Sequence, residues 1–145
     1  MQVKSGSAAN GGKIMGVDAR AIAKGTASGK ALVSPDAISF FGGVDPKSGV
    51  VVEKGHSLEG KCIAGKVLVF PRGKGSTVGS YVMLQLKKNG CAPCAIINEE
   101  AEPIIAVGAI ISGIPMVDKL ENRAYARLKD GMQVKVEGTL GKVEF

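Results

Sequence analysis

Apolar positions in the first half of the chain occur in short runs that are separated by glycine, proline and aspartate. Such runs, with their β-branched and aromatic residues, predict short strands joined by turns. Four strands are expected, over residues 17–23, 31–33, 38–41 and 50–53, with the turn Asp45-Pro46-Lys47-Ser48-Gly49 before the last of them. The first half of the chain is therefore predicted to be mostly β.

The second half opens with a continuous apolar run over residues 67–70, a pattern typical of a strand that is buried on both faces. A helix is expected to follow, with Ser76 as a suitable N-cap and Gly90 as its C-terminal glycine, preceded by two lysines. Its apolar stripe has the spacing i, i+4, i+8: Val78, Val82 and Leu86.

This strand-then-helix pattern repeats to the end of the chain. The elements expected are a strand over 95–97, a helix over 103–112 opened by proline, a strand at 116–117, a helix over 120–128 and a strand at 134–136. Strands that alternate with helices imply parallel pairing. We expect an α/β fold in one domain over residues 15–145, with a β-rich N-terminal half packed against a βαβαβ-type C-terminal half. Residues 1–14 are polar and small and are expected to form a disordered extension.

Composition limits the class of protein. The chain has 145 residues, 45% of them apolar and 22% charged, which is typical of a single globular domain. No apolar run approaches the ~20 residues that a membrane-spanning helix needs, so we expect no membrane insertion. Three cysteines, an odd number, in a chain without an export signal indicate a reducing cytoplasm rather than a disulfide scaffold.

The net charge of +6 is local. Residues 61–88 hold six lysines and arginines and no acid, so the thirteen remaining cations balance the thirteen acids. A nucleic-acid surface usually adds aromatic residues for stacking, and there are only six aromatics in the chain. The charge pattern therefore favours a small anionic ligand over nucleic acid.

The basic segment contains a glycine-rich loop between the predicted strand at 67–70 and the helix after it. Such a loop exposes backbone N–H groups and a helix N-terminus, to which Arg72 and Lys74 add full charges, so it predicts an anion site. It is not a phosphate loop of the Walker A type, because Lys74 is followed by glycine and Leu68 stands where the first glycine belongs. The residues alone leave two roles open for Ser76: a helix N-cap, or a base whose alkoxide the cations stabilise.

Other polar residues give weaker signals. No Ser-His-Asp arrangement is visible, and the single histidine, His56, is expected to be a solvated loop residue. An acidic cluster follows the predicted strand at 95–97, at the sheet edge where α/β folds bind ligands, and it is either a ligand site or a solvated loop. Its members are Glu99, Glu100 and Glu102.

The cysteines offer a possible metal or redox site. Cys91 and Cys94 form a C-x-x-C, and with Cys62 and His56 they make four conceivable zinc ligands, or three ligands of an iron–sulfur cluster. A reactive C-x-x-C normally lies at a helix N-terminus, whereas this one lies between a helix end and the next strand. We therefore expect the cysteines to be structural and the chain to hold no metal.

Several motifs together resemble the small subunit of the aconitase X family, over essentially all of residues 15–140. They are Phe41-Gly42-Gly43-Val44-Asp45-Pro46, Gly73-Lys74-Gly75-Ser76-Thr77-Val78-Gly79-Ser80-Tyr81, Ala95-Ile96-Ile97-Asn98 with Glu100-Ala101-Glu102-Pro103, and Ile114-Pro115-Met116-Val117-Asp118. The resemblance implies a swivelling β/β/α domain, related to the mobile domain of aconitase. This domain closes over an active site on a large catalytic subunit that carries a four-iron four-sulfur cluster.

The reaction that the resemblance implies is loss of water from (R)-5-phosphomevalonate to give trans-anhydromevalonate 5-phosphate, a step of an archaeal route to isoprenoids. The proton-abstracting serine of the family falls on Ser76, and iron on the partner accepts the departing hydroxyl. The residues expected to bind the anionic substrate are Arg72, Lys74, Gly75, Thr77, Gly79 and Ser80.

Three alternatives remain at this point. One is another hydroxy-acid dehydratase of the family, such as one acting on cis-3-hydroxyproline. The second is a non-catalytic anion-binding or regulatory module in which Ser76 only caps a helix. The third is a metal or redox protein that uses Cys91 and Cys94.

Overall fold

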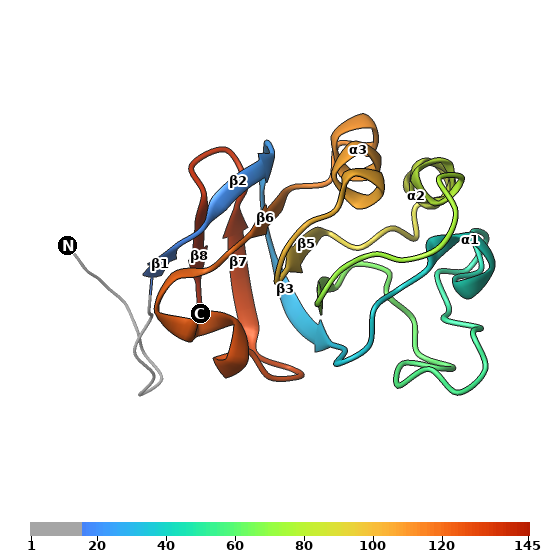
Figure 1. Cartoon of the computed structure of the whole chain (residues 1–145), viewed down its shortest axis with the longest axis horizontal. Coiled ribbons are helices and arrows are strands. Elements are labelled where there is room, and N and C mark those ends of the chain that lie inside the picture. Colours follow the sequence, from blue (N-terminus) through green and yellow to red (C-terminus); the bar gives the residue numbers. More distant parts are fainter. Residues whose placement is uncertain (1–15) are drawn as a thin grey trace.

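A computed structural model describes residues 16–145 (Figure 1). Residues 1–14, where the sequence predicts a disordered extension, lie outside the described residues. The described chain forms an eight-stranded sheet with the strand order β1-β8-β7-β3-β4-β5-β6-β2. The strands are β1 (Gly16–Asp18), β2 (Arg20–Ala23), β3 (Thr26–Val33), β4 (Val67–Phe70), β5 (Ala95–Asn98), β6 (Met116–Asp118), β7 (Gln133–Glu137) and β8 (Lys142–Glu144).

The two ends of this sheet are joined by one residue of chain. Strand β1 pairs antiparallel with β8 and strand β2 pairs antiparallel with β6, and only Ala19 separates β1 from β2. The predicted strand over 17–23 is therefore split between two partners, and the sheet curls round so that its ends meet. Closure of this kind leaves few unpaired strand edges.

Alternate residues of the strands serve two cores, as the two faces of a sheet require. Val67 and Val69 of β4 face the inside of the curled sheet, while Leu68 and Phe70 pack under the helices. The prediction that residues 67–70 are buried on both faces is confirmed.

The α/β half of the fold is confirmed. Strands β3, β4, β5 and β6 pair in parallel, and α2 (Gly79–Lys88) and α3 (Pro103–Ser112) connect β4 to β5 and β5 to β6. The two helices lie side by side on one face of the sheet (Figure 1). No helix within residues 16–145 combines the length and the hydropathy needed to cross a membrane.

Two of the predicted N-terminal strands are wrong. Within residues 38–41, Ile38 makes only a single bridge to Gly73, and Phe40–Gly43 form the helical turn α1. Residues 50–53 contribute isolated bridges to Val44 and Cys62 rather than a strand. Ile38, Phe40 and Val51 are buried, as in a strand, whereas Phe41 and Val52 are exposed. The buried side chains pack inside a long folded loop between β3 and β4 rather than in a strand ladder.

The C-terminal end differs from expectation in two places. The predicted helix over 120–128 is the 3-10 helix η2 (Glu121–Arg127), which Asn122 and Arg123 interrupt with left-handed backbone angles. The strand β8 was not predicted, because three residues are too few to show the alternation of apolar and polar positions that indicates a strand.

Candidate anion site

The glycine-rich loop, residues 71–78, starts where β4 ends and is held on both sides. On one side the Pro71 carbonyl accepts hydrogen bonds from the backbone N–H groups of Glu99 and Glu100, at 3.0 and 3.2 Å. The buried side chain of Asn98 donates to the Phe70 carbonyl at 3.0 Å. The loop therefore lies at the carboxyl edge of the parallel strands, where α/β folds bind ligands.

On its other side the loop is hydrogen-bonded to the segment before α1. The Ile38 N–H donates to the Arg72 carbonyl at 3.2 Å, and the Lys74 N–H donates to the Ile38 carbonyl at 3.0 Å. Gly73, between these two bonds, packs so tightly that a Cβ there would lie 2.6 Å from Glu102 Oε1 and would overlap Ile105. Only glycine allows this approach, so the course of the loop is fixed by close packing.

Gly75 is constrained in a second way. Its φ angle is +89°, and a Cβ on it would fall 2.5 Å from the hydroxyl of Ser39. That hydroxyl is itself engaged, because it donates to the Phe41 carbonyl at 3.0 Å. The segment before α1 and the glycine-rich loop thus pack against one another at Ser39 and Gly75.

Ser76 is exposed and does not cap the helix that follows it. Helix α2 begins at Gly79, with Val78 at its N-cap position. The Ser76 hydroxyl accepts a hydrogen bond from the Val78 N–H at 3.1 Å, inside the turn that precedes the helix. The expected N-cap role is therefore wrong, because the helix begins two residues later than an N-cap at Ser76 predicts.

The loop also offers free donors. Within the described residues, the backbone N–H groups of Gly75, Ser76 and Thr77 have no hydrogen-bond acceptor. Consecutive free N–H groups before a helix N-terminus are a common arrangement for binding an anion.

Both cations of the loop are paired with carboxylates from other segments. The guanidinium of Arg72 lies 3.6 Å from Glu99 Oε1, and the ammonium of Lys74 lies 2.9 Å from Glu53 Oε2. The charge of the loop is therefore partly neutralised, although residues 61–88 contain no acid. Sequence reasoning missed Glu53, because its contact joins residues 21 positions apart.

Lys74 and Glu53 face a shallow cavity of about 350 Å³ between α1 and the loop. Its other lining residues are Ser39, Phe41, Gly42, Gly43 and Gly75. Ser76 is not among them, so the cavity lies beside Lys74 and is not lined by Ser76.

The remaining predicted residues divide by burial. Thr77 is exposed on the loop, whereas Gly79 and Ser80 are buried in the first turn of α2. The Ser80 hydroxyl donates to the Thr77 carbonyl at 3.0 Å. The structure therefore brings Arg72, Lys74, Gly75, Ser76 and Thr77 together on the exposed loop, and sets Gly79 and Ser80 beneath them.

The three acids after β5 have three different surroundings. Glu99 pairs with Arg72, and Glu100 is exposed. Glu102 is the N-cap of α3 and accepts hydrogen bonds from the N–H groups of Ile104 and Ile105, at 3.0 and 2.9 Å. Glu102 is therefore a structural cap of α3 and not a solvated loop residue.

Near the Arg72–Glu99 pair lies Tyr125, which sequence reasoning did not single out. Burial raises the pKa of this phenol, the charge of Glu99 raises it further, and Arg72 opposes the shift. The hydroxyl is buried and has no hydrogen-bond partner among the described residues.

The expectation that His56 is solvated is wrong. The residue is buried, its Nε2 lies 2.9 Å from the Ala37 carbonyl, and its Nδ1 accepts from the Leu58 N–H at 3.0 Å. Because Nδ1 is an acceptor, Nε2 carries the proton and donates it to Ala37. His56 therefore ties its own turn to the segment that leads to Ile38 and Ser39.

The cysteines are all free thiols. Cys62 is exposed, Cys91 is buried and Cys94 is half-buried. Burial raises the pKa of the Cys91 and Cys94 thiols. Across residues 16–145, no three histidine, cysteine, aspartate or glutamate side chains are grouped so that they could hold a metal ion.

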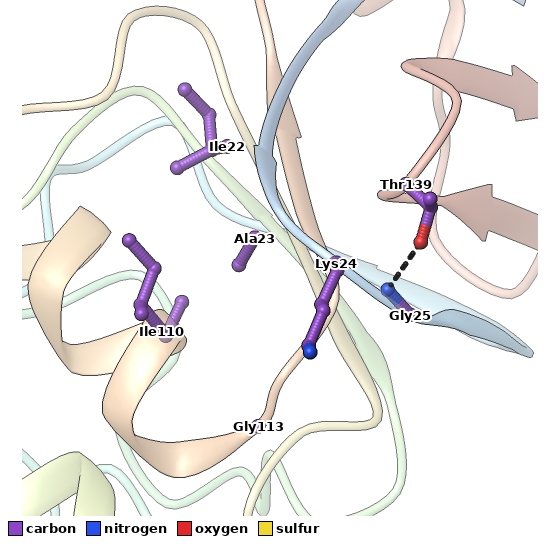
Figure 2. Close-up of a pocket in the computed structure, with 8 residues that line it drawn as sticks. Ile22, Ala23, Lys24, Gly25, Ile110, Gly113 and Thr139 are labelled. Carbon is purple, nitrogen blue, oxygen red and sulfur yellow. Dashed lines mark hydrogen bonds between the residues drawn. The ribbon is translucent and has the colours of Figure 1, made fainter.

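A larger hollow lies away from this loop and differs from it chemically. It has a volume of about 620 Å³ and lies between the end of α3 and the turn after β2 (Figure 2). The hollow is lined by Ile22, Ala23, Ala109 and Ile110, and Lys24 is the only charged lining residue in the described part of the chain. It contains none of the predicted site residues, and its apolar walls do not suit an anion.

Comparisons with known proteins identify a family, named relatives and a solved structure that are similar to this chain. The family model of the aconitase X swivel domain matches residues 16–145. The chain is 66% identical, over 125 residues (86% of this chain and 87% of the relative), to the phosphomevalonate dehydratase small subunit of Methanosarcina acetivorans. It is 62% identical, over 130 residues (90% of this chain and 98% of the relative), to the protein of the same name from Methanocella arvoryzae. The crystal structure of Thermococcus kodakaraensis aconitase X, in its holo-form, superposes with a TM-score of 0.85 at 53% identity, covering 90% of this chain and 97% of that one.

Proposed function

The chain belongs to the aconitase X swivel domain family, and from this we propose that it is the small subunit of a dehydratase that acts on (R)-5-phosphomevalonate. The product is trans-anhydromevalonate 5-phosphate. The proposal rests on the names of relatives at 62–66% identity, which cover nearly the whole described chain. The observation within the molecule that carries it is an exposed loop that holds a serine hydroxyl, two cations and, among the described residues, three backbone N–H groups without an acceptor.

Ser76 is proposed as the proton acceptor. As the alkoxide, its oxygen takes the proton from the carbon next to the substrate carboxylate and becomes the neutral hydroxyl. Negative charge on this oxygen is stabilised by the Val78 N–H, which already donates to it, and by the nearby N-terminus of α2. A serine is a weak base in water, so this local stabilisation is what makes the role chemically feasible.

The anionic groups of the substrate are proposed to bind around this serine. Arg72 and Lys74 supply charge, and the N–H groups of Gly75, Ser76 and Thr77 supply directed hydrogen bonds. Gly79 and Ser80 support the turn from below. We assign the iron–sulfur cluster, which supplies a Lewis acid for the departing hydroxyl, to the large subunit, and we place the assembly in the cytoplasm.

A second candidate is a non-catalytic anion-binding module. It is favoured by one observation: the Ser76 hydroxyl already has a structural task, since it accepts the Val78 N–H within the turn. In that case the loop binds an anion and Ser76 only shapes it. A dehydratase acting on another hydroxy acid is the alternative within the family.

The test is reconstitution under anaerobic conditions. This chain, its large subunit and their mixture are each supplied with 5-phosphomevalonate, and formation of the unsaturated acid is followed. Turnover by the mixture alone supports the proposal. Absence of turnover in a mixture that assembles with its cluster intact contradicts it, and a panel of other hydroxy acids then separates a different substrate from a binding module.

A further inference from the structure

The contact between Lys74 and Glu53 is the closest ion pair of the loop, and its two side chains differ in length and in exposure. The distance from Nζ to Oε2 is 2.9 Å. The Lys74 side chain is 46% exposed and the Glu53 side chain 32%. A lysine has a long flexible stem, so this contact selects one position of the ammonium among many.

Glu53 sits in a place that the surrounding backbone defines. The N–H of Val52 donates to the Gly43 carbonyl at 2.9 Å, and the N–H of His56 donates to the Glu53 carbonyl at 3.3 Å. Gly43 leaves room for the carboxylate, because a Cβ there would lie 3.3 Å from Glu53 Oε1. Glu53 is also the shorter and less exposed side chain of the pair, so we take it as the member that positions Lys74.

Both side chains of the ion pair keep hydrogen-bonding capacity for a further partner. An ammonium has three donors, and the structure uses one of those of Lys74 for Glu53. The remaining donors lie at a cavity lined by Gly42 and Gly75, where small residues leave space for a ligand oxygen. A positively charged donor held at such a cavity suits an anionic group of a substrate.

We propose that Glu53 is a positioning residue, which holds the Lys74 ammonium at the cavity between α1 and the glycine-rich loop so that it binds an anionic group of the substrate. This inference rests on the proposed function. It assigns the cavity to substrate binding, apart from Ser76, where the proton is removed.

A carboxylate beside an anion site can also weaken substrate binding, and the two effects change KM in opposite directions. A carboxylate near an anion site repels the anion, so a Glu53 that merely neutralised Lys74 would weaken substrate binding. Removing it would then lower KM. If Glu53 positions Lys74, removing it raises KM, because the free lysine must be ordered again each time substrate binds.

The experiment uses the reconstituted complex of both subunits and a double-mutant cycle with 5-phosphomevalonate. The variants are Glu53→Ala, Glu53→Gln, Lys74→Met and the double variant Glu53→Ala with Lys74→Met. We expect Glu53→Ala to raise KM by about threefold to fivefold, the upper range for an exposed ion pair, with kcat within about twofold. Glu53→Gln, whose amide oxygen still accepts from Nζ, should fall between Glu53→Ala and the unchanged protein.

The cycle separates positioning from structural damage. In the Lys74→Met background, Glu53→Ala should leave KM unchanged, since there is no ammonium left to position. Asp18→Ala, which removes the exposed carboxylate paired with Lys142 on β1 and β8, is the matched control and should not move KM.

Three results would overturn the inference: a lower KM for Glu53→Ala, an equal rise in KM in the Lys74→Met background, or unchanged KM in Glu53→Ala. Its failure is distinguishable from failure of the proposed function. The unchanged complex must first turn over 5-phosphomevalonate, and if it does not, the proposed function fails before any variant is compared.

Discussion

The Ser76 hydroxyl and the Val78 N–H are joined by a hydrogen bond of 3.1 Å, across one intervening residue. This bond belongs to the turn before α2 and not to the helix, whose first residue is Gly79. The position of the hydroxyl is consequently set by the loop and by what the loop packs against, above all the segment before α1. Substitutions in the loop should therefore affect the site more than substitutions in the helix.

The packing of Gly75 against Ser39 gives a first prediction. Gly75→Ala should reduce turnover of the complex and destabilise the chain by more than the ~1–2 kcal/mol that a left-handed backbone costs an alanine, because the added Cβ also meets the Ser39 hydroxyl. Gly55→Ala is the matched control, since Gly55 has φ of +80° and open space around it. Urea unfolding and steady-state kinetics measure both effects. Equal losses in the two variants would show that the contact with Ser39 has no consequence.

The closure of the sheet gives a second prediction, centred on Asp118. This fully buried carboxylate accepts two hydrogen bonds from Arg20, at 2.8 and 2.9 Å, and one from the Ala101 N–H at 2.7 Å. Asp118→Ala should lower the free energy of unfolding by about 3 kcal/mol or more, because it leaves these donors without an acceptor.

Asp18→Ala serves as the control for this loss. Asp18 faces Lys142 across an exposed gap of 3.4 Å, and its removal should cost at most about 1 kcal/mol. The two values come from urea denaturation of the isolated chain. A loss for Asp118→Ala no greater than that for Asp18→Ala would mean that the Arg20–Asp118 contact does not stabilise the pairing of β2 with β6.

Asp36 gives a prediction about pH. Hydrogen bonds from the Ser57 backbone N–H and hydroxyl lower the pKa of this carboxyl. The group therefore stabilises the folded chain above its unfolded-state pKa of about 3.9, and this stabilisation is lost as pH falls through the lower folded-state pKa. Thermal unfolding at a series of pH values from 6 to 3 should show a smaller loss in Asp36→Asn than in the unchanged chain. Parallel curves would contradict the role of Asp36.

The cysteines give a fourth prediction. Cys62 is exposed, whereas burial raises the pKa of Cys91 and Cys94 and so reduces their thiolate fraction. Iodoacetamide at neutral pH should therefore label Cys62 first, as peptide mass spectrometry of timed samples will show. Faster labelling of Cys91 or Cys94 would indicate that the C-x-x-C segment opens in solution.

The parallel core of the fold was predictable because each of its strands carries its own signal. Residues 67–70 and 95–97 are uninterrupted apolar runs, and Pro103 marks the start of α3. The segments 38–41 and 50–53 also have apolar patterns. An apolar pattern indicates which side chains are buried, but it does not indicate whether the segment pairs with another strand. Ile38, Phe40 and Val51 are buried in a folded loop, where the segments form only isolated bridges.

The site could be predicted in part for the same reason. Glycines and cations at 72–75 are visible as a local sequence feature, and the loop lies between β4 and α2 as expected. Glu53 and His56 were missed or misread because their roles depend on contacts with Lys74 and Ala37, which lie 21 and 19 positions away. Only the folded chain shows such contacts.

The most direct test of the account is the turnover of 5-phosphomevalonate by the reconstituted complex carrying Ser76→Ala. Loss of a positioned base should reduce kcat by about 100-fold to 10,000-fold, while assembly with the large subunit, followed by size-exclusion chromatography, remains. Ser28→Ala, at an exposed serine on β3, should match the unchanged complex. A Ser76→Ala complex that assembles and retains full turnover would contradict the role of Ser76 as proton acceptor.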